Sequence, residues 1–222
     1  MSEAGDPEQP YANALVKKLA LCLPQMTQDV HVQRQMFSKL FLMVTARIQR
    51  LVKTYLRRFH RSCSIIHPAS FDPNKVSIAL LAAVTYIGGL YSEDISERGA
   101  VLEGLDLLEC MVFSSKTFMT FPHLGRSNDS TDQGNQSLFD DLQAGCLVVV
   151  AQHCFGNHTA KARAMETRFG ELIRASASAC SFMTCIDAYR SVENLAFPRV
   201  VKLFKIERLN NNGCGKKLAQ GM

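Results

Sequence analysis

The sequence predicts an all-α fold, built as an irregular bundle of several helices. Three observations support this prediction. Apolar residues recur at steps of three and four through successive segments between residues 11 and 176, as one face of a helix requires. Gly and Pro are absent from the longest of these segments and gather between segments. Hydrophobic residues make up 47% and charged residues 20% of the 222 residues, which is enough to bury a core.

Residues 1–30 are predicted to be a partly disordered N-terminal lead-in. Residues 1–10 are acidic and contain Pro7 and Pro10. Residues 11–23 carry Leu15, Val16 and Leu19 at helical spacing, which indicates a short helix that stops before a proline. The N-terminus has no basic segment followed by an apolar one, so no signal peptide is predicted. No apolar stretch is long enough to span a bilayer, so no membrane contact is expected.

The strongest helical period runs over residues 32–59. It predicts one long amphipathic helix of about six or seven turns. Its apolar face holds Met36, Phe37, Leu40, Phe41, Val44, Ile48, Leu51, Val52, Tyr55, Leu56 and Phe59.

The opposite face of this predicted helix is basic. Between residues 47 and 61 there are six basic residues and no acidic one: Arg47, Arg50, Lys53, Arg57, Arg58 and Arg61. Two interpretations stay open. The residues form a solvated helix face, or they form a patch that meets an acidic partner or a phosphate backbone.

Residues 76–91 are predicted to form the central buried helix, because they are apolar nearly all round. The preceding helix stops at Pro68, and Asp72 followed by Pro73 offers a helix start. Gly88 and Gly89 lower helix propensity by about 1 kcal/mol each relative to alanine. A close crossing with a neighbouring helix would explain their presence.

The remaining segments complete the predicted domain. Helical period continues over residues 94–113, an exposed loop is predicted near residues 119–137, and residues 137–176 are predicted to form a helical hairpin that turns at Gly156 and Asn157. We therefore expect a helical domain over residues 31–177. Residues 178–222 lose the helical period and are expected to be an atypical, poorly ordered tail.

Candidate chemical groups are few, and no catalytic, cofactor-binding or metal-binding residue is predicted. His60, His67, His153 and His158, with Cys63 or Cys154, lack the tight spacing of zinc sites. Asp140 and Asp141 are expected to open a helix, where the dipole favours acids. No nucleophile elbow, Walker loop or dinucleotide-binding glycine motif occurs. The eight scattered cysteines are typical of reduced thiols in an intracellular protein.

The order of residues between 55 and 91 resembles the fungal-specific transcription factor domain, the middle homology region of fungal zinc-cluster regulators. The residues that carry this resemblance are Tyr55, Phe59, His60, Ile65, Ile66, His67, Phe71, Leu80, Leu81, Ala83, Gly88, Tyr91 and Ser92. A second region, from Leu142 through Gly156 and Asn157 to Ala175, resembles the next helical hairpin of that family. Together the similarity covers roughly residues 47–176.

The resemblance implies an all-α regulatory domain of a nuclear transcription regulator, with no enzymatic activity. The expected partners are proteins, either transcription machinery or a full-length regulator, and a homodimer or heterodimer is one possible form. DNA binding and zinc are expected only at family level, because neither a six-cysteine zinc cluster nor a zinc finger occurs in the first 50 residues. Two alternatives stay open: a stand-alone helical adaptor or dimerisation protein, and a helical enzyme of a biosynthetic cluster.

Overall fold

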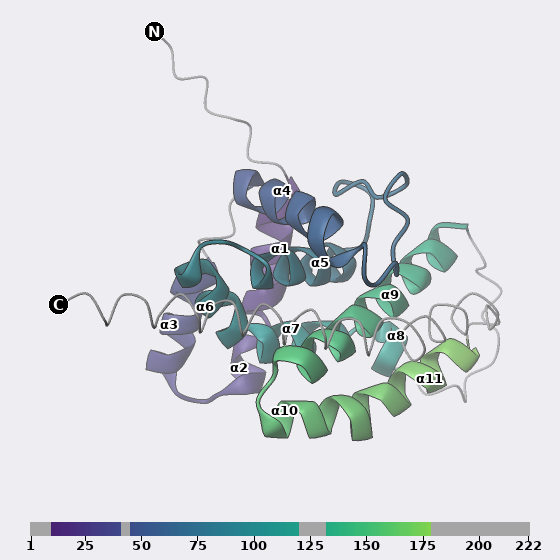
Figure 1. Cartoon of the computed structure of the whole chain (residues 1–222). Coiled ribbons are helices and arrows are strands. Elements are labelled where there is room, and N and C mark those ends of the chain that lie inside the picture. Colours follow the sequence, from purple (N-terminus) through teal and green to yellow (C-terminus); the bar gives the residue numbers. More distant parts are fainter. Residues whose placement is uncertain (1–9, 41–44, 120–131, 179–222) are drawn as a thin grey trace, which may run out of the picture.

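The computed structural model describes residues 10–40, 45–119 and 132–178, and over these residues the protein is all-α, as predicted (Figure 1). The helices pack around one central helix, and no β-strand occurs within the described ranges. In chain order they are α1 (Pro10–Ala20), α2 (Leu23–Met26), α3 (Val30–Leu40), α4 (Thr45–Thr54), η1 (Tyr55–Phe59), α5 (Ile78–Leu90), α6 (Ile95–Glu103), α7 (Leu105–Phe113), α8 (Lys116–Met119), α9 (Asp132–Phe155), α10 (His158–Arg163), η2 (Ala164–Arg168) and α11 (Phe169–Ser178). The two η elements are single π-helical turns.

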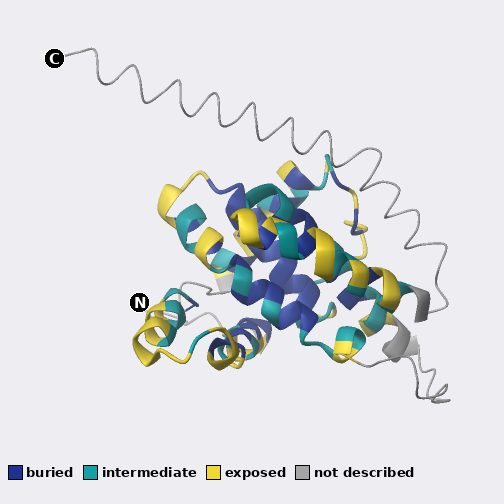
Figure 2. Cartoon of the chain, turned by 90° about the horizontal axis from the view of Figure 1, so that it is seen from below, coloured by how far each residue is buried: buried dark blue, intermediate teal, exposed yellow. Residues whose placement is uncertain are grey.

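The central helix is α5, which confirms the predicted buried helix. Every residue from 79 to 90 is buried, and α1, α4, η1, α6, α7 and α9 all pack against it. Figure 2 shows the buried residues gathered in the middle of the molecule. The predicted start at Asp72 is wrong. Asp72 accepts a hydrogen bond from the Asn74 amide in a turn, and α5 begins after Ser77, whose hydroxyl accepts one from the Leu80 amide.

The single long helix predicted over residues 32–59 is described as α3, followed by α4 and η1, and its continuity across residues 41–44 lies outside the described residues. Helix α3 contacts α1 and α2, whereas α4 contacts α1 and α5 and lies apart from α3 in Figure 1. The periodic apolar stripe predicted helix on both sides of this gap.

Aromatic rings join the end of α4 to the ends of α5 and α9. Tyr55 and Phe59 are buried on the π turn η1, with ring centroids 5.3 Å apart. The Phe59 ring lies 6.0 Å from Tyr91 at the end of α5, and Tyr91 lies 6.4 Å from Phe155 at the end of α9. The π turn closes where the His60 amide donates to the Tyr55 carbonyl. Tyr55, Phe59 and Tyr91, three residues of the run that resembles the regulator family, therefore lie in the packed core.

Two glycines allow close approaches in this core. A Cβ atom on Gly88 would lie 2.0 Å from the carbonyl oxygen of Leu51 in α4, so the expected close helix crossing is confirmed. A Cβ atom on Gly104 would lie 2.9 Å from the Tyr86 ring. Gly104 also separates α6 from α7, so the helical period predicted over residues 94–113 belongs to two helices.

The predicted C-terminal hairpin is present. Helix α9 and the α10–η2–α11 segment are joined at Gly156 and Asn157, and the Asn157 side chain caps α10 by accepting a hydrogen bond from the Ala160 amide. Helix α9 begins at Asp132, so the loop predicted near residues 119–137 is wrong over its last six residues, while residues 120–131 lie outside the described residues. The predicted tail at residues 178–222 also lies outside them, except for Ser178.

The hydrophobic core starts before residue 31. Tyr11, Leu15 and Leu19 of α1 are buried, and α1 packs against α5 and α7. The predicted boundary between a lead-in at residues 1–30 and a domain at residues 31–177 therefore does not separate α1 from the core. Among the described helices, none is both long and apolar enough to cross a membrane.

Candidate interaction surface

The basic residues predicted on one helix face lie on α4, on η1 and just beyond it, and three of them are paired with acids from another part of the chain. Arg47 Nε lies 3.3 Å and Arg50 lies 2.5 Å from the same Glu97 oxygen, and Arg58 lies 2.6 Å from Glu93. Both acids come from the segment that follows α5. The basic stretch is therefore acid-free only along the sequence, and three of its six basic residues are paired within the chain.

The other three basic residues form an exposed row. Lys53, Arg57 and Arg61 follow one another at intervals of four residues, and all three are exposed. Within the described parts of the chain, no carboxylate forms an ion pair with any of them. The Arg57 Nε donates to the Lys53 carbonyl at 3.4 Å, which holds the side chain along the helix. We call these three residues the cationic row.

A hollow of about 340 Å³ adjoins the cationic row. It lies between the α4–η1 helix and the end of α5, and Arg57 belongs both to its wall and to the row. Its lining residues are Arg50, Thr54, Arg57, Arg58, Tyr91, Ser92, Glu93 and Asp94. Three arginines line this hollow beside the carboxylates of Glu93 and Asp94, and two of the arginines, Arg50 and Arg58, already form ion pairs.

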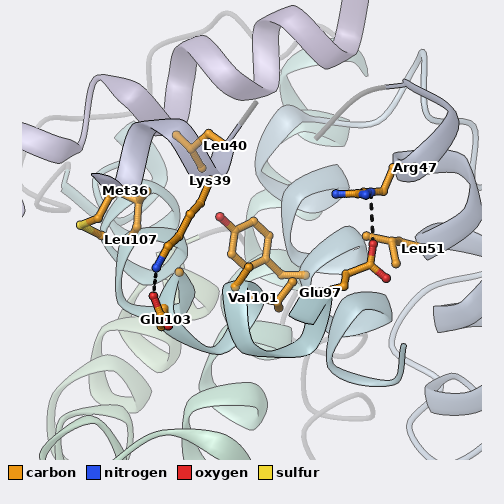
Figure 3. Close-up of a pocket in the computed structure, with 12 residues that line it drawn as sticks. Met36, Lys39, Leu40, Arg47, Leu51, Glu97, Val101, Glu103 and Leu107 are labelled. Atoms are coloured by element: carbon orange, nitrogen blue, oxygen red, sulfur yellow. Dashed lines mark hydrogen bonds and ion pairs between the residues drawn. The ribbon is translucent and has the colours of Figure 1, made fainter. Parts of the chain in front are cut away.

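A second hollow, of about 50 Å³, lies among α3, α4, α6 and α7 (Figure 3). Ion pairs Lys39–Glu103 and Arg47–Glu97 tie α6 to α3 and to α4 at its edges. Its apolar wall consists of Met36, Leu40, Leu51, Tyr86, Val101 and Leu107. A volume of this size holds a few water molecules. The two ion pairs therefore hold α6 against α3 and α4. The space that they border is too small for a substrate.

Sequence reasoning missed a buried network of charged residues on the other side of the molecule. Glu109 on α7 is buried and accepts hydrogen bonds from Arg163 at 2.6 Å, Arg168 at 2.8 Å and Gln152 at 2.9 Å. Arg163 also lies 2.5 Å from Asp106. The only signal in the sequence was a glutamate at an otherwise apolar position of a predicted helix.

The network fastens the C-terminal hairpin to α7. Burial alone would raise the pKa of Glu109, but hydrogen bonds from Arg163 and Arg168 outweigh it, so this pKa lies below its ordinary value. Arg168 also stacks 4.9 Å above the Phe113 ring. An ionised carboxylate held between two guanidinium groups keeps its charge near neutral pH. Such a group suits a structural clamp and does not suit proton transfer.

The prediction that Asp140 and Asp141 open a helix is wrong. Helix α9 starts at Asp132, so the pair lies inside it. The Asp140 carboxylate accepts a hydrogen bond from the Ser77 amide at 2.7 Å, at the N-terminus of α5. The Asp141 carboxylate accepts one from the Thr117 hydroxyl at 2.8 Å. The pair therefore joins α9 to the start of α5 and to α8.

Replacing Asp140 with alanine is expected to lower the free energy of unfolding by about 1–2 kcal/mol, because the Ser77 amide loses its acceptor at the first turn of α5. Urea unfolding followed by circular dichroism measures this change. Asp72→Ala is the matched control, since Asp72 bonds only within its own turn. Equal midpoints for the two variants would contradict the role of Asp140 as the acceptor of the Ser77 amide.

The four histidines considered for zinc are dispersed. His60 ends η1 and its pKa is lowered, mainly by burial, as is the pKa of His153 near the end of α9. His67 and His158 are exposed. Among the described residues, no group of three or more His, Cys, Asp or Glu side chains is arranged to hold a metal ion.

The thiols near these histidines are protonated packing groups. Burial raises the pKa of Cys63 to about 12 and that of Cys154 to about 11. Cys22, buried beside Cys110, has its pKa raised to about 11, again mainly by burial. Since the thiolate is the reactive form, these three cysteines are poor nucleophiles at neutral pH and act as small apolar side chains.

Comparison with known proteins identifies no relative: no family model, no curated protein and no solved structure matches this chain. The geometry described above is therefore the basis for inferring its function.

Proposed function

We propose that this chain is a helical regulatory module, similar to the fungal-specific transcription factor domain, and that it acts in the nucleus through protein contacts. The observation that carries the proposal is the packing of residues 55–91. Tyr55, Phe59 and Tyr91 form a connected aromatic cluster, and Gly88 permits the crossing of α5 with α4. Several residues that carry the resemblance therefore lie in the core between α4, η1 and α5.

The polar groups of the described residues also favour an interaction module over an enzyme. Asp140 accepts a hydrogen bond from the Ser77 amide, and Glu109 is neutralised by two arginines. These hydrogen bonds and ion pairs account for the burial of both carboxylates. On the basic face of α4 and η1, the cationic row forms no ion pair within the described residues, so it offers a surface for a second molecule.

The proposal is tested by placing the full chain between a heterologous DNA-binding domain and an activation segment, and measuring transcription of a reporter. We expect transcription to differ from that obtained with a flexible linker of equal length. A chain carrying Gly88→Leu is the control, because it removes the packing of α4 on α5. Equal transcription from the wild-type chain, the variant and the linker would contradict the proposal, as would exclusion of the tagged chain from the nucleus.

A further inference from the structure

We propose that the cationic row, Lys53, Arg57 and Arg61, docks an acidic peptide segment of a partner protein, and that Glu93 competes with this segment from within the chain. The inference rests on the proposed function, since it names the chemistry of one protein contact. It is carried by the exposed positive charges of the row, by the ion pairs beside it and by the exposure of Glu93.

Lys53 on α4 and Arg57 on η1 stand on one helical stretch, and Arg61 lies in the turn that follows it. With a rise of about 1.5 Å per helical residue, side chains four residues apart are separated by about 6 Å along the axis. An acidic segment in helical conformation that carries carboxylates four residues apart has the same spacing as Lys53 and Arg57. Tyr55 and Phe59 are buried directly beneath this part of the helix, so its position is fixed by the core.

The charge of the row is not compensated by the neighbouring acids, because these are engaged elsewhere. Glu97 is buried, accepts from Ser92 and pairs with Arg47 and Arg50. Asp94 caps α6 through the Ser96 and Glu97 amides. The surface around η1 therefore keeps an excess of positive charge that an acidic partner would neutralise.

Glu93 differs from Glu97 in that its side chain lies at the surface. Its side chain is 86% exposed, and the Arg58 side chain with which it pairs at 2.6 Å is 44% exposed. An exposed ion pair of this kind contributes little to stability and exchanges readily. Arg58 also donates to the Tyr91 carbonyl at 3.4 Å, which keeps its guanidinium beside the hollow when Glu93 leaves. A carboxylate of the partner can therefore take the place of Glu93 on Arg58.

An acidic peptide fits this surface better than a nucleic acid does. Specific DNA-binding proteins commonly neutralise about six to ten phosphates, and the row supplies three cations without a carboxylate partner in the described residues. Binding of single strands relies on exposed aromatic rings on which bases stack. The aromatic residue in the adjoining hollow, Tyr91, is buried.

The test measures binding of a fluorescent helical peptide with glutamate at three positions four residues apart, by anisotropy at low and physiological salt. A peptide with glutamine at those positions is the ligand control. We expect the full chain to prefer the glutamate peptide, and the triple variant K53E/R57E/R61E to bind it at least about tenfold more weakly. Glu93→Gln is expected to tighten binding about two- to fivefold, because the competing charge is removed.

The matched control is K17E/R34E/K161E, which changes the net charge equally at exposed positions outside the row. Circular dichroism is used to check that both triple variants keep the wild-type helical content. An equal loss of binding in the control would overturn the proposal, since net charge alone would then explain it. Tighter binding of a DNA duplex than of the glutamate peptide would also overturn it, in favour of a nucleic-acid surface.

The reporter measurement separates this inference from the proposed function. If K53E/R57E/R61E changes reporter transcription as much as Gly88→Leu does, the row is supported as the contact through which the module acts. If the triple variant leaves the effect of the chain on transcription intact and the glutamate peptide does not bind, the docking proposal is overturned while the regulatory role stands.

Discussion

Replacing Gly88 with alanine is expected to destabilise the protein by about 3 kcal/mol or more. The added Cβ would lie 2.0 Å from the carbonyl oxygen of Leu51 and 2.7 Å from its carbonyl carbon. Both are backbone atoms of α4, so the clash cannot be relieved by a side-chain rotation. Helix α4 must move away from α5, and the buried contacts of Ile48, Leu51 and Val52 loosen with it.

The sign of this change is what makes the prediction informative. In an unobstructed helix, glycine to alanine stabilises by about 1 kcal/mol, because alanine has the higher helix propensity. Gly99 and Gly170 are helical, and a Cβ on either would meet nothing within 4 Å. We therefore expect Gly99→Ala and Gly170→Ala to raise the urea midpoint and Gly88→Ala to lower it. A Gly88→Ala protein as stable as the Gly99→Ala protein would contradict the described crossing.

The elements predicted well from the sequence are those whose signal is local. Helix α5 is apolar on every side, and a helix of that composition has to be buried. The hairpin turn at Gly156 and Asn157 follows from turn-forming residues between two periodic segments, and Asn157 does cap the next helix. Gly88 was singled out because a glycine inside a buried helix needs a packing reason, and Leu51 supplies it.

The elements missed depend on contacts between distant residues. Asp140 accepts a hydrogen bond from the Ser77 amide, 63 positions earlier in the chain, and no local pattern reports such a pairing. The same holds for the basic face, where Glu97 is separated from Arg50 by 47 residues, so a count of charges along the sequence overestimates the free positive charge.

Replacing Glu109 with glutamine is expected to cost about 3 kcal/mol at neutral pH. The variant keeps the shape of the side chain but leaves Arg163 and Arg168 without their shared carboxylate, which lies 2.6 and 2.8 Å from their Nε atoms. Removing one partner from a buried charged network is costly because the remaining charges stay desolvated. Glu171→Gln is the control. It removes only the ion pair between Arg168 and Glu171, a less buried acid one helical turn away. We therefore expect the free energy of unfolding to fall by about 0.5 kcal/mol or less.

The pH dependence of stability distinguishes a charged clamp from a simple packing effect at Glu109. In the folded protein its pKa lies below the ordinary value of 4.5, because the two arginines favour the ionised form more than burial disfavours it. The stabilisation it provides is therefore complete above about pH 4.5 and is lost as the pH falls through the lower, folded-state pKa. Wild type and Glu109→Gln should differ by a constant amount between about pH 5 and 7, and their urea midpoints should converge in more acidic solution. If the difference stayed constant down to pH values at which carboxylates are protonated, the loss would come from packing, and the clamp would not depend on the charge of Glu109.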